Sequence, residues 1–150
     1  MVNLIIIVTV AVSILCFRNH ALLFKLALQP YMIFRRGQWW RVITHGFVHG
    51  DWGHLLINML VFWSFGTYVL KLFGLQHQAG AAMEANSRFL LLYFGGMVFA
   101  SLYDLIMRRN NPNFTSIGAS GAVSAVTFTS IFFDPLGKIW LMGIIPLPAI

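Results

Sequence analysis

The sequence has few charged residues, and acidic residues are the scarcest among them. Charged residues make up 9% of the 150 positions, only 4 residues are Asp or Glu, and 59% of the positions are hydrophobic. Soluble domains carry roughly 25% charged residues. This deficit excludes an ordinary soluble domain and indicates a membrane protein, and the length allows a single domain over residues 1–150.

The basic residues are numerous enough to raise the question of a nucleic-acid partner. Ten Lys and Arg residues give a net charge of +6. They form no basic stripe interleaved with aromatic residues, which a nucleic-acid-binding surface needs. They flank apolar runs instead, where they meet anionic lipid headgroups. We therefore expect a lipid bilayer and no nucleic acid as the partner. The single cysteine, Cys16, excludes an intrachain disulfide.

Four apolar runs have the composition of membrane helices. They cover residues 1–17, 52–70, 89–107 and 117–133. The first run lacks the positive n-region and the cleavage site of a signal peptide, so we interpret it as a membrane helix. Residues 18–50, between the first two runs, mix Arg and Lys with Trp and Phe, which is typical of an interfacial loop in the headgroup layer. Asp51 is expected to cap the second helix.

A fifth apolar run begins at Ile139 and reaches the last residue. It is about 12 residues long, whereas a membrane-spanning helix needs roughly 20. We expect the chain to be truncated inside this fifth transmembrane helix. The predicted fold class is an all-α membrane protein, a polytopic helical bundle that is incomplete at its C-terminal end.

The fourth run opens with the small-residue motif Gly118-Ala119-Ser120-Gly121. A hydroxyl in a membrane helix is costly without a partner, and small residues in such helices commonly serve close packing. The unpaired N–H groups of a helix N-terminus can also stabilise a developing oxyanion. The motif alone therefore leaves helix packing and catalysis open.

A second polar group enters the second run. It consists of His45, His49, His54 and Asn58. His54 and Asn58 are four residues apart, so a helix places both on one face. Such side chains either link membrane helices by hydrogen bonds or form a functional site. A third interpretation is a metal site formed by His45, His49 and His54. Because a His-Glu-x-x-His pattern is absent and acidic ligands are scarce, we expect no metal. Asp104, near the end of the third run, is expected to face the membrane interface.

Taken together, these features resemble the rhomboid family of intramembrane serine proteases. The resemblance covers nearly the whole chain and has three parts in order: Trp40-Arg41 in the first loop, His-x3-His-x4-His-x3-Asn from His45 to Asn58, and Gly-x-Ser-Gly around Ser120. It implies a rhomboid-type helical bundle with its N-terminus in the cytoplasm. It also implies an endopeptidase that cleaves transmembrane segments of membrane-protein substrates without a cofactor.

The resemblance implies a role for each residue that matches the family's motifs. Ser120 would be the nucleophile, and His54 and Asn58 would donate hydrogen bonds to the oxyanion together with the backbone N–H of Ser120. The other matching residues would support the site: Arg41 by donating to carbonyls of the first loop beside Trp40, His45 and His49 near the mouth of the site, Gly118 in the motif, and Gly121 by letting a sixth helix approach closely.

The family's general base is a histidine on the sixth helix, downstream of the serine. The last histidine of this sequence is His77, so none follows Ser120. A serine hydroxyl is a weak nucleophile without an adjacent base. We therefore expect the base beyond residue 150 and predict that the present chain alone is inactive.

Two other functions compete with proteolysis. A non-catalytic rhomboid-like protein that binds membrane clients has no need of an oxyanion site, and a histidine in a sixth apolar segment would distinguish the protease from it. A channel or transporter fragment would spread ionisable groups over several helices at mid-depth, whereas here they cluster near one end of two helices. The sequence indicates neither the substrate nor an oligomeric state.

The distribution of positive charge conflicts with the orientation that the resemblance implies. The first and third loops hold most of the Lys and Arg residues, and the positive-inside rule on its own places them in the cytoplasm. We follow the family, because arginines of the first loop can be held in the interface as structural residues. The basic residues of these two loops are Arg18, Lys25, Arg35, Arg36, Arg41, Arg108 and Arg109.

Overall fold

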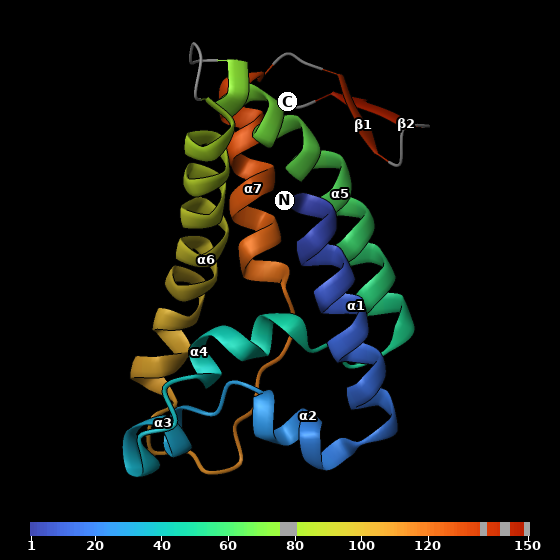
Figure 1. Cartoon of the computed structure of the whole chain (residues 1–150). Coiled ribbons are helices and arrows are strands. Elements are labelled where there is room, and N and C mark those ends of the chain that lie inside the picture. Colours follow the sequence, from blue (N-terminus) through green and yellow to red (C-terminus); the bar gives the residue numbers. More distant parts are fainter. Residues whose placement is uncertain (76–80, 136–137, 142–144, 149–150) are drawn as a thin grey trace.

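The computed structural model of the chain describes residues 1–75, 81–135, 138–141 and 145–148. Over these residues the body of the fold is a bundle of long helices, and a group of short helices lies across one end of it (Figure 1). The long helices are α1 (Val2–Arg18), α5 (Trp52–Leu75), α6 (Ala81–Met107) and α7 (Ser120–Phe133). The short ones are α2 (His20–Leu26), α3 (Pro30–Arg36), α4 (Arg41–Thr44) and the 3₁₀ turn η1 (His45–Phe47).

The described helices agree with the fold class predicted from the sequence. Two of them are long and apolar enough to cross a membrane, over Trp52–Gly74 in α5 and Ala82–Met107 in α6, with 23 and 26 residues. Helices α1 and α7 are also apolar but shorter, with 17 and 14 residues. The prediction of an all-α helical membrane bundle is therefore confirmed for this part of the chain.

Two helix boundaries differ from the predicted ones. Helix α6 begins at Ala81 and not at Phe89, because Glu84 and Arg88 form an i,i+4 ion pair of 2.6 Å that supports an additional helical stretch. Helix α7 begins at Ser120 and not at residue 117, because Gly118 has a φ of +114°, which no helix contains. The later start of α7 places the serine at the first position of the helix.

The expectation of a fifth helix beginning at Ile139 is wrong for the residues described. Strands β1 (Lys138–Leu141) and β2 (Ile145–Pro148) pair there as an antiparallel hairpin, seen at the upper right of Figure 1. Pro146 and Pro148 explain the difference. Proline removes a helical hydrogen bond and drives the residue before it into an extended conformation.

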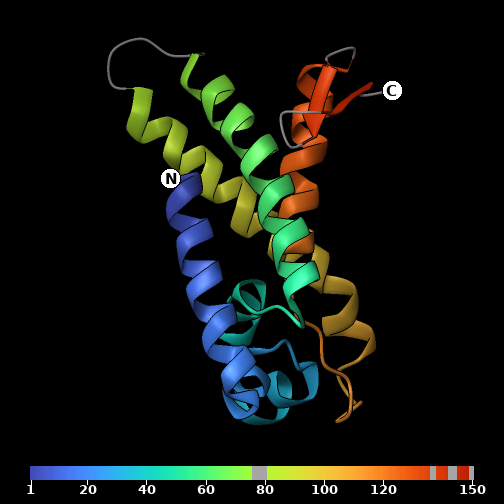
Figure 2. The ribbon, with the colours of Figure 1, turned by 90° about the vertical axis from the view of Figure 1, so that its right-hand side faces the viewer.

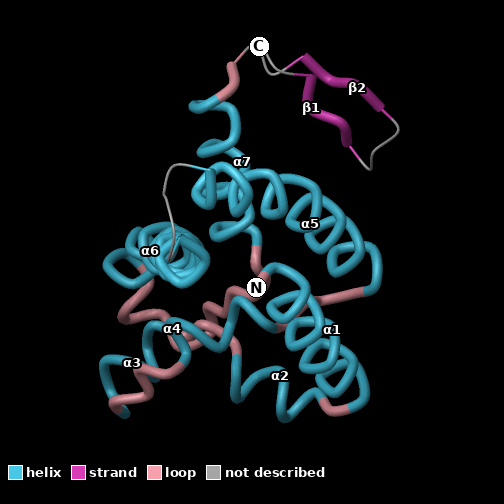
Figure 3. Tube along the Cα trace, turned by 45° about the horizontal axis from the view of Figure 1, so that its top comes forward, coloured by secondary structure: helices cyan, strands magenta, loops and turns pink. Residues whose placement is uncertain are grey.

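The packing of the long helices fixes where the serine lies. Helix α7 packs against both α5 and α6, and α1 packs against α5 (Figures 2 and 3). The α6–α7 crossing is made by small residues, with Gly96 against Ala125 and Gly121 against Ala100. Small residues let helix backbones approach closely. The largest fully buried side chains of the bundle core are Phe62, Phe89, Tyr93, Met97, Val69 and Val126.

The first loop is fastened to the segment that leads into α7. Leu28 and Ser116 exchange two backbone hydrogen bonds of 2.9 and 3.0 Å. The side-chain amide of Gln29 donates to the carbonyl of Pro112 at 2.9 Å. These bonds satisfy backbone groups that would otherwise be unpaired. They also hold the residues before Ser120 against α2–α4, which lie at the same end of the bundle (Figure 2).

Candidate active site

Ser120 is the first residue of α7 and is exposed. The residue before it, Ala119, accepts the first helical hydrogen bond from Val123. In the described part of the chain, no hydrogen-bond partner is found for the backbone N–H groups of Ser120, Gly121 and Ala122. Unpaired N–H groups at a helix N-terminus stabilise a negatively charged group that lies beside them. The serine therefore lies beside backbone N–H groups that can donate to a negatively charged group.

The imidazole of His54 packs against Gly118, two residues before Ser120. A Cβ atom at Gly118 would lie 2.8 Å from Cε1 and 3.0 Å from Nε2 of that ring, so only glycine fits. Asp51 positions His54 from the other side, because its Oδ1 accepts a hydrogen bond of 2.8 Å from the His54 backbone N–H. This is the N-terminal cap expected from the sequence. The structure thus brings His54 to the segment that carries the serine.

Asn58 lies one turn further along the same face of α5 and is buried. Its Nδ2 donates a hydrogen bond of 3.0 Å to the carbonyl of His54, within its own helix. The structure therefore shows no bond from Asn58 to the serine segment. A side-chain amide carries two N–H groups, so one donor remains for a ligand.

His49 is fully buried and joins the serine segment to α1. Its Nε2 accepts a hydrogen bond of 3.5 Å from the Ala119 backbone N–H, and its Nδ1 lies 3.0 Å from the hydroxyl oxygen of Ser13. Its ring also meets the ring of His54 edge to face, with centroids 4.9 Å apart. Burial and the neighbouring His54 lower the pKa of His49 to about 4, while Asp51 acts in the opposite direction. His49 is therefore neutral at physiological pH.

His45 supports the same segment from the first loop. Its carbonyl accepts a hydrogen bond of 3.0 Å from the Gly118 N–H. The His45 Nδ1 lies 3.0 Å from the Arg41 carbonyl, and its Nε2 lies 3.3 Å from the hydroxyl oxygen of Ser101 on α6. Burial lowers the pKa of His45, and its hydrogen bonds to the backbone partly oppose this. Both ring nitrogens thus have partners.

Arg41 is buried in the first loop, where it holds the backbone together. One of its Nη atoms donates to the carbonyls of Phe24 and Ala27 at 2.7 and 2.8 Å, and its Nε donates to Gln38 at 2.7 Å. Burial lowers the pKa of the guanidinium. The neighbouring Trp40 is half exposed and precedes α4. Among the described residues, the hydrogen bonds of the Arg41 side chain are made within the first loop.

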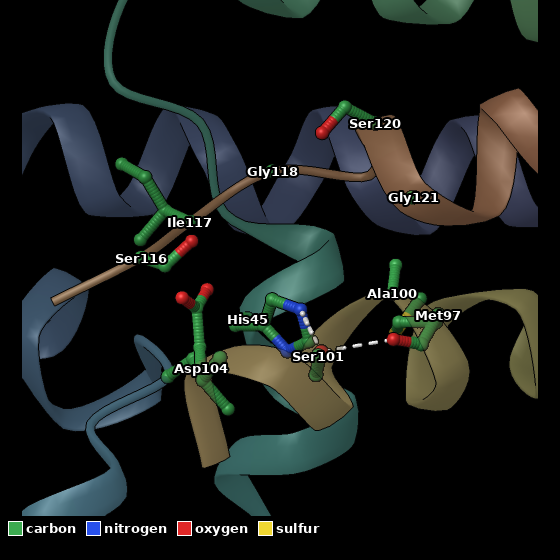
Figure 4. A pocket seen from close by; sticks show the side chains of 11 residues that line it. His45, Met97, Ala100, Ser101, Asp104, Ser116, Ile117, Gly118, Ser120 and Gly121 are labelled. Atoms are coloured by element: carbon green, nitrogen blue, oxygen red, sulfur yellow. Dashed lines mark hydrogen bonds between the residues drawn. The ribbon is translucent and has the colours of Figure 1, made fainter. Parts of the chain in front are cut away.

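A polar cavity of about 180 Å³ opens beside Ser120 (Figure 4). His45, Ser101 and Asp104 line one side of it, and the other side is lined by Ser116, Ile117, Gly118, Ser120 and Gly121. His54 and Asn58 do not line it. Asp104, which we expected to face the membrane interface, lines this cavity and is partly buried. Ser101 and Ser116 belong to no motif in the sequence, and their place at the cavity depends on contacts between distant segments.

Among the residues that the structure describes, no group of three His, Cys, Asp or Glu side chains is suited to hold a metal ion. Gly121, which we expected to receive a sixth helix, is packed here against Ala100 of α6. The arrangement places a serine hydroxyl at a helix N-terminus, with an imidazole near the same segment and a polar cavity beside it. It supplies no histidine after Ser120 to act as its base.

The sequence of this chain is similar to a known family and to several known proteins. The family model described as "Rhomboid domain" matches residues 36–150. The chain is 34% identical over 122 residues to the RHOMBOID-like protein 12, mitochondrial, of Arabidopsis thaliana, covering 77% of this chain and 36% of that protein. It is 33% identical over 88 residues to the rhomboid protease GluP of Bacillus subtilis, covering 59% of this chain and 14% of that protein.

A yeast protein is similar to the same degree. Rhomboid protein 1, mitochondrial, of Saccharomyces cerevisiae is 33% identical over 110 residues, covering 71% of this chain and 28% of that protein. The chain therefore spans about a third or less of the length of these curated relatives. No solved structure gives a significant match.

Proposed function

Because this chain belongs to the rhomboid family of intramembrane proteases, we propose that it provides the nucleophile and the oxyanion donors of an intramembrane serine endopeptidase. The observation that carries the proposal is the place of Ser120. It opens α7 with free backbone N–H groups, and the imidazole of His54 packs on Gly118 in the same segment.

The proposed reaction follows from this placement. The Oγ of Ser120 attacks a substrate peptide carbonyl, and its proton passes to a general base while the carbonyl oxygen becomes an oxyanion. The Ser120 N–H, the His54 ring and the second N–H of Asn58 donate hydrogen bonds to that oxyanion. Removing one such donor typically lowers the rate by about 10²–10³-fold. The intermediate then collapses to an acyl-enzyme as the amine leaves with a proton, and water releases the acyl group.

The base in this proposal is a histidine that the present sequence does not contain. A serine without a base is a weak nucleophile, so residues 1–150 alone are expected to be inactive. His45 and His49 are unsuited to replace it, because both of their ring nitrogens already have hydrogen-bond partners.

We place the site near one face of the membrane. Trp39, Trp40 and Trp52 lie at the end of the bundle that holds Ser120, and all three are exposed. Tryptophan side chains favour the membrane–water interface. The proposed substrates are transmembrane segments of other proteins that enter at this level. The proposed topology is multi-pass with the N-terminus in the cytoplasm.

The test is cleavage of a reporter protein with one transmembrane segment by the full-length protein that contains this segment. Ser120→Ala should lower cleavage by at least about 10³-fold. Ser124→Ala is the matched control, since Ser124 is an exposed serine one turn further along α7, and it should cleave normally. Unchanged cleavage by Ser120→Ala would show that the nucleophile is another residue. Retention of the reporter without cleavage by the unmodified protein would favour the client-binding alternative.

A further inference from the structure

Ser13 is a fully buried hydroxyl residue in the middle of the apolar helix α1. Serine in a helix usually returns its hydrogen bond to a carbonyl of the preceding turn. Thr9 does so, donating to the carbonyl of Ile5 at 2.8 Å. The hydroxyl of Ser13 instead donates to the carbonyl of Phe47 at 3.0 Å and lies 3.0 Å from His49 Nδ1. Ser13 therefore links α1 to the loop beside the active site.

The hydrogen-bond donors around His49 determine which ring nitrogen carries the proton. The backbone N–H of Ala119 can only donate, so His49 Nε2 must accept and carries no proton. The Ser13 hydroxyl has one proton, which it donates to the carbonyl of Phe47. The Ser13 oxygen therefore accepts a hydrogen bond from His49 Nδ1. Both arguments assign the Nδ1–H tautomer. The bonds then run in one direction, from Ala119 through His49 and Ser13 to Phe47.

This series of hydrogen bonds begins at Ala119, the residue before the serine. Its N–H donates to His49, and the carbonyl of Ala119 accepts from Val123 at 2.9 Å. Ala119 is thereby held through both of its backbone polar groups. The first N–H left free at the start of α7 is that of Ser120. The ring of His49 also packs on that of His54, so the same residue supports the proposed nucleophile and one proposed oxyanion donor.

We propose that Ser13 is a positioning residue for the nucleophile: it fixes His49 as the Nδ1–H tautomer, and His49 holds the Ala119 amide so that the Ser120 N–H is presented to the substrate. The catalytic consequence rests on the proposed function. The hydrogen bonds themselves do not rest on the proposed function, because they are made within residues 1–150. Ser13 touches no reacting atom in this scheme and acts through His49.

The bonding is tested by nuclear magnetic resonance of the ¹⁵N-histidine-labelled chain in bicelles. The unmodified chain should show His49 protonated at Nδ1 and a protected Ala119 amide. In Ser13→Ala the tautomers should mix, and exchange of the Ala119 amide should become about tenfold faster, corresponding to about 1.4 kcal/mol. Ser13→Thr keeps the hydroxyl and should restore both signals.

Thr9→Val is the matched control for this experiment. It removes a buried hydroxyl from the same helix, but one that donates its proton to the carbonyl of Ile5 in α1. It should leave the His49 tautomer and the Ala119 exchange rate unchanged. The inference is overturned if Ser13→Ala keeps the Nδ1–H tautomer and the Ala119 protection, or if Thr9→Val alters them equally.

The catalytic consequence is tested in the full-length protein with the transmembrane reporter. Ser13→Ala should lower kcat about tenfold with KM unchanged, because substrate contacts stay intact while the nucleophile is less well held. Ser13→Thr should recover most of the rate. A normal kcat in Ser13→Ala would refute the positioning role. Absence of Ser120-dependent cleavage would refute the proposed protease, and the tautomer measurement would still decide the bonding.

Discussion

Gly118 is the single residue on which the geometry around the serine depends most directly. Its φ of +114° lies in a region that other residues rarely adopt, and the His54 ring occupies the space that a side chain would need. The glycine thus has two functions, which are to turn the chain into α7 and to admit the imidazole. Sequence inspection identified the residue from its motif, and the structure supplies these physical reasons.

Gly118→Ala should therefore impair both folding and the site. The backbone strain costs about 1–3 kcal/mol, and the new methyl group collides with His54 and displaces it. Gly37→Ala is the control, since Gly37 also has a positive φ, of +66°, but nothing lies within 4 Å of its Cβ position. Both variants should lose unfolding free energy in a denaturant titration. Only Gly118→Ala should also move the ¹⁵N resonances of His54, and unchanged resonances would contradict the packing described here.

At the scale of elements, the position of α7, which carries Ser120, depends on how it crosses α6. Gly96 faces the methyl group of Ala125 and Gly121 faces that of Ala100, and backbone atoms of the two helices also lie close to these glycines. Without water to drive association, such crossings depend on close van der Waals contact. Larger side chains at these positions would push α7 away from α6.

Gly96→Val should lower the unfolding free energy by about 1–3 kcal/mol, because its side chain collides with Ala125. The neighbouring Gly95 offers a control on the same helix, since nothing lies within 4 Å of its Cβ position. Gly95→Val should be close to neutral. The measurement is a denaturant titration of both variants in mixed micelles. Equal losses in the two variants would mean that the crossing is not close-packed.

At the scale of the whole molecule, buried histidines join segments that are far apart in the sequence. His49 contacts Ser13 of α1, Ala119 before α7 and the ring of His54 on α5. His45 joins the first loop to α6 and to Gly118. His49 must stay neutral to accept the hydrogen bond from the Ala119 N–H, so its protonation is expected to weaken the fold as a whole.

The stability of the fold should consequently fall in mild acid. An unfolded histidine has a pKa of about 6.5, and folding lowers that of His49 to about 4. The unfolded chain then binds the extra proton between these values, so the stabilisation is complete above pH 6.5 and is lost as the pH falls toward 4. The loss attributable to His49 is on the order of 3 kcal/mol, and burial of His45 adds to it in the same direction.

Unfolding free energy measured between pH 7.5 and pH 4 checks this prediction. His49→Gln should flatten the pH dependence substantially, with the remainder due to His45. His20→Gln is the control at an exposed position and should keep the slope of the unmodified chain. If His49→Gln follows the same slope as the unmodified chain, His49 is not the group that titrates.

The prediction from sequence succeeded where the physical cause is local. Runs of apolar residues predicted the helices, and Asp51 was recognised as a cap, because hydrogen bonding within a helix and its cap involves neighbouring residues. The prediction failed where the conformational preference of particular residues was overlooked. Pro146 and Pro148 oppose a helix after Ile139, and Glu84 with Arg88 supports an early start of α6.

The sequence by itself determined the class of the protein, its family and the residues of its motifs, because composition and spacing are properties of the chain. Only the tertiary structure decided what each residue touches. It placed His54 on Gly118, Asp104 at the cavity and Ser13 on His49. Such contacts join residues far apart in the sequence, such as Ala119 and His49, which are 70 positions apart. They exist because the helices have packed, and no local pattern encodes that packing.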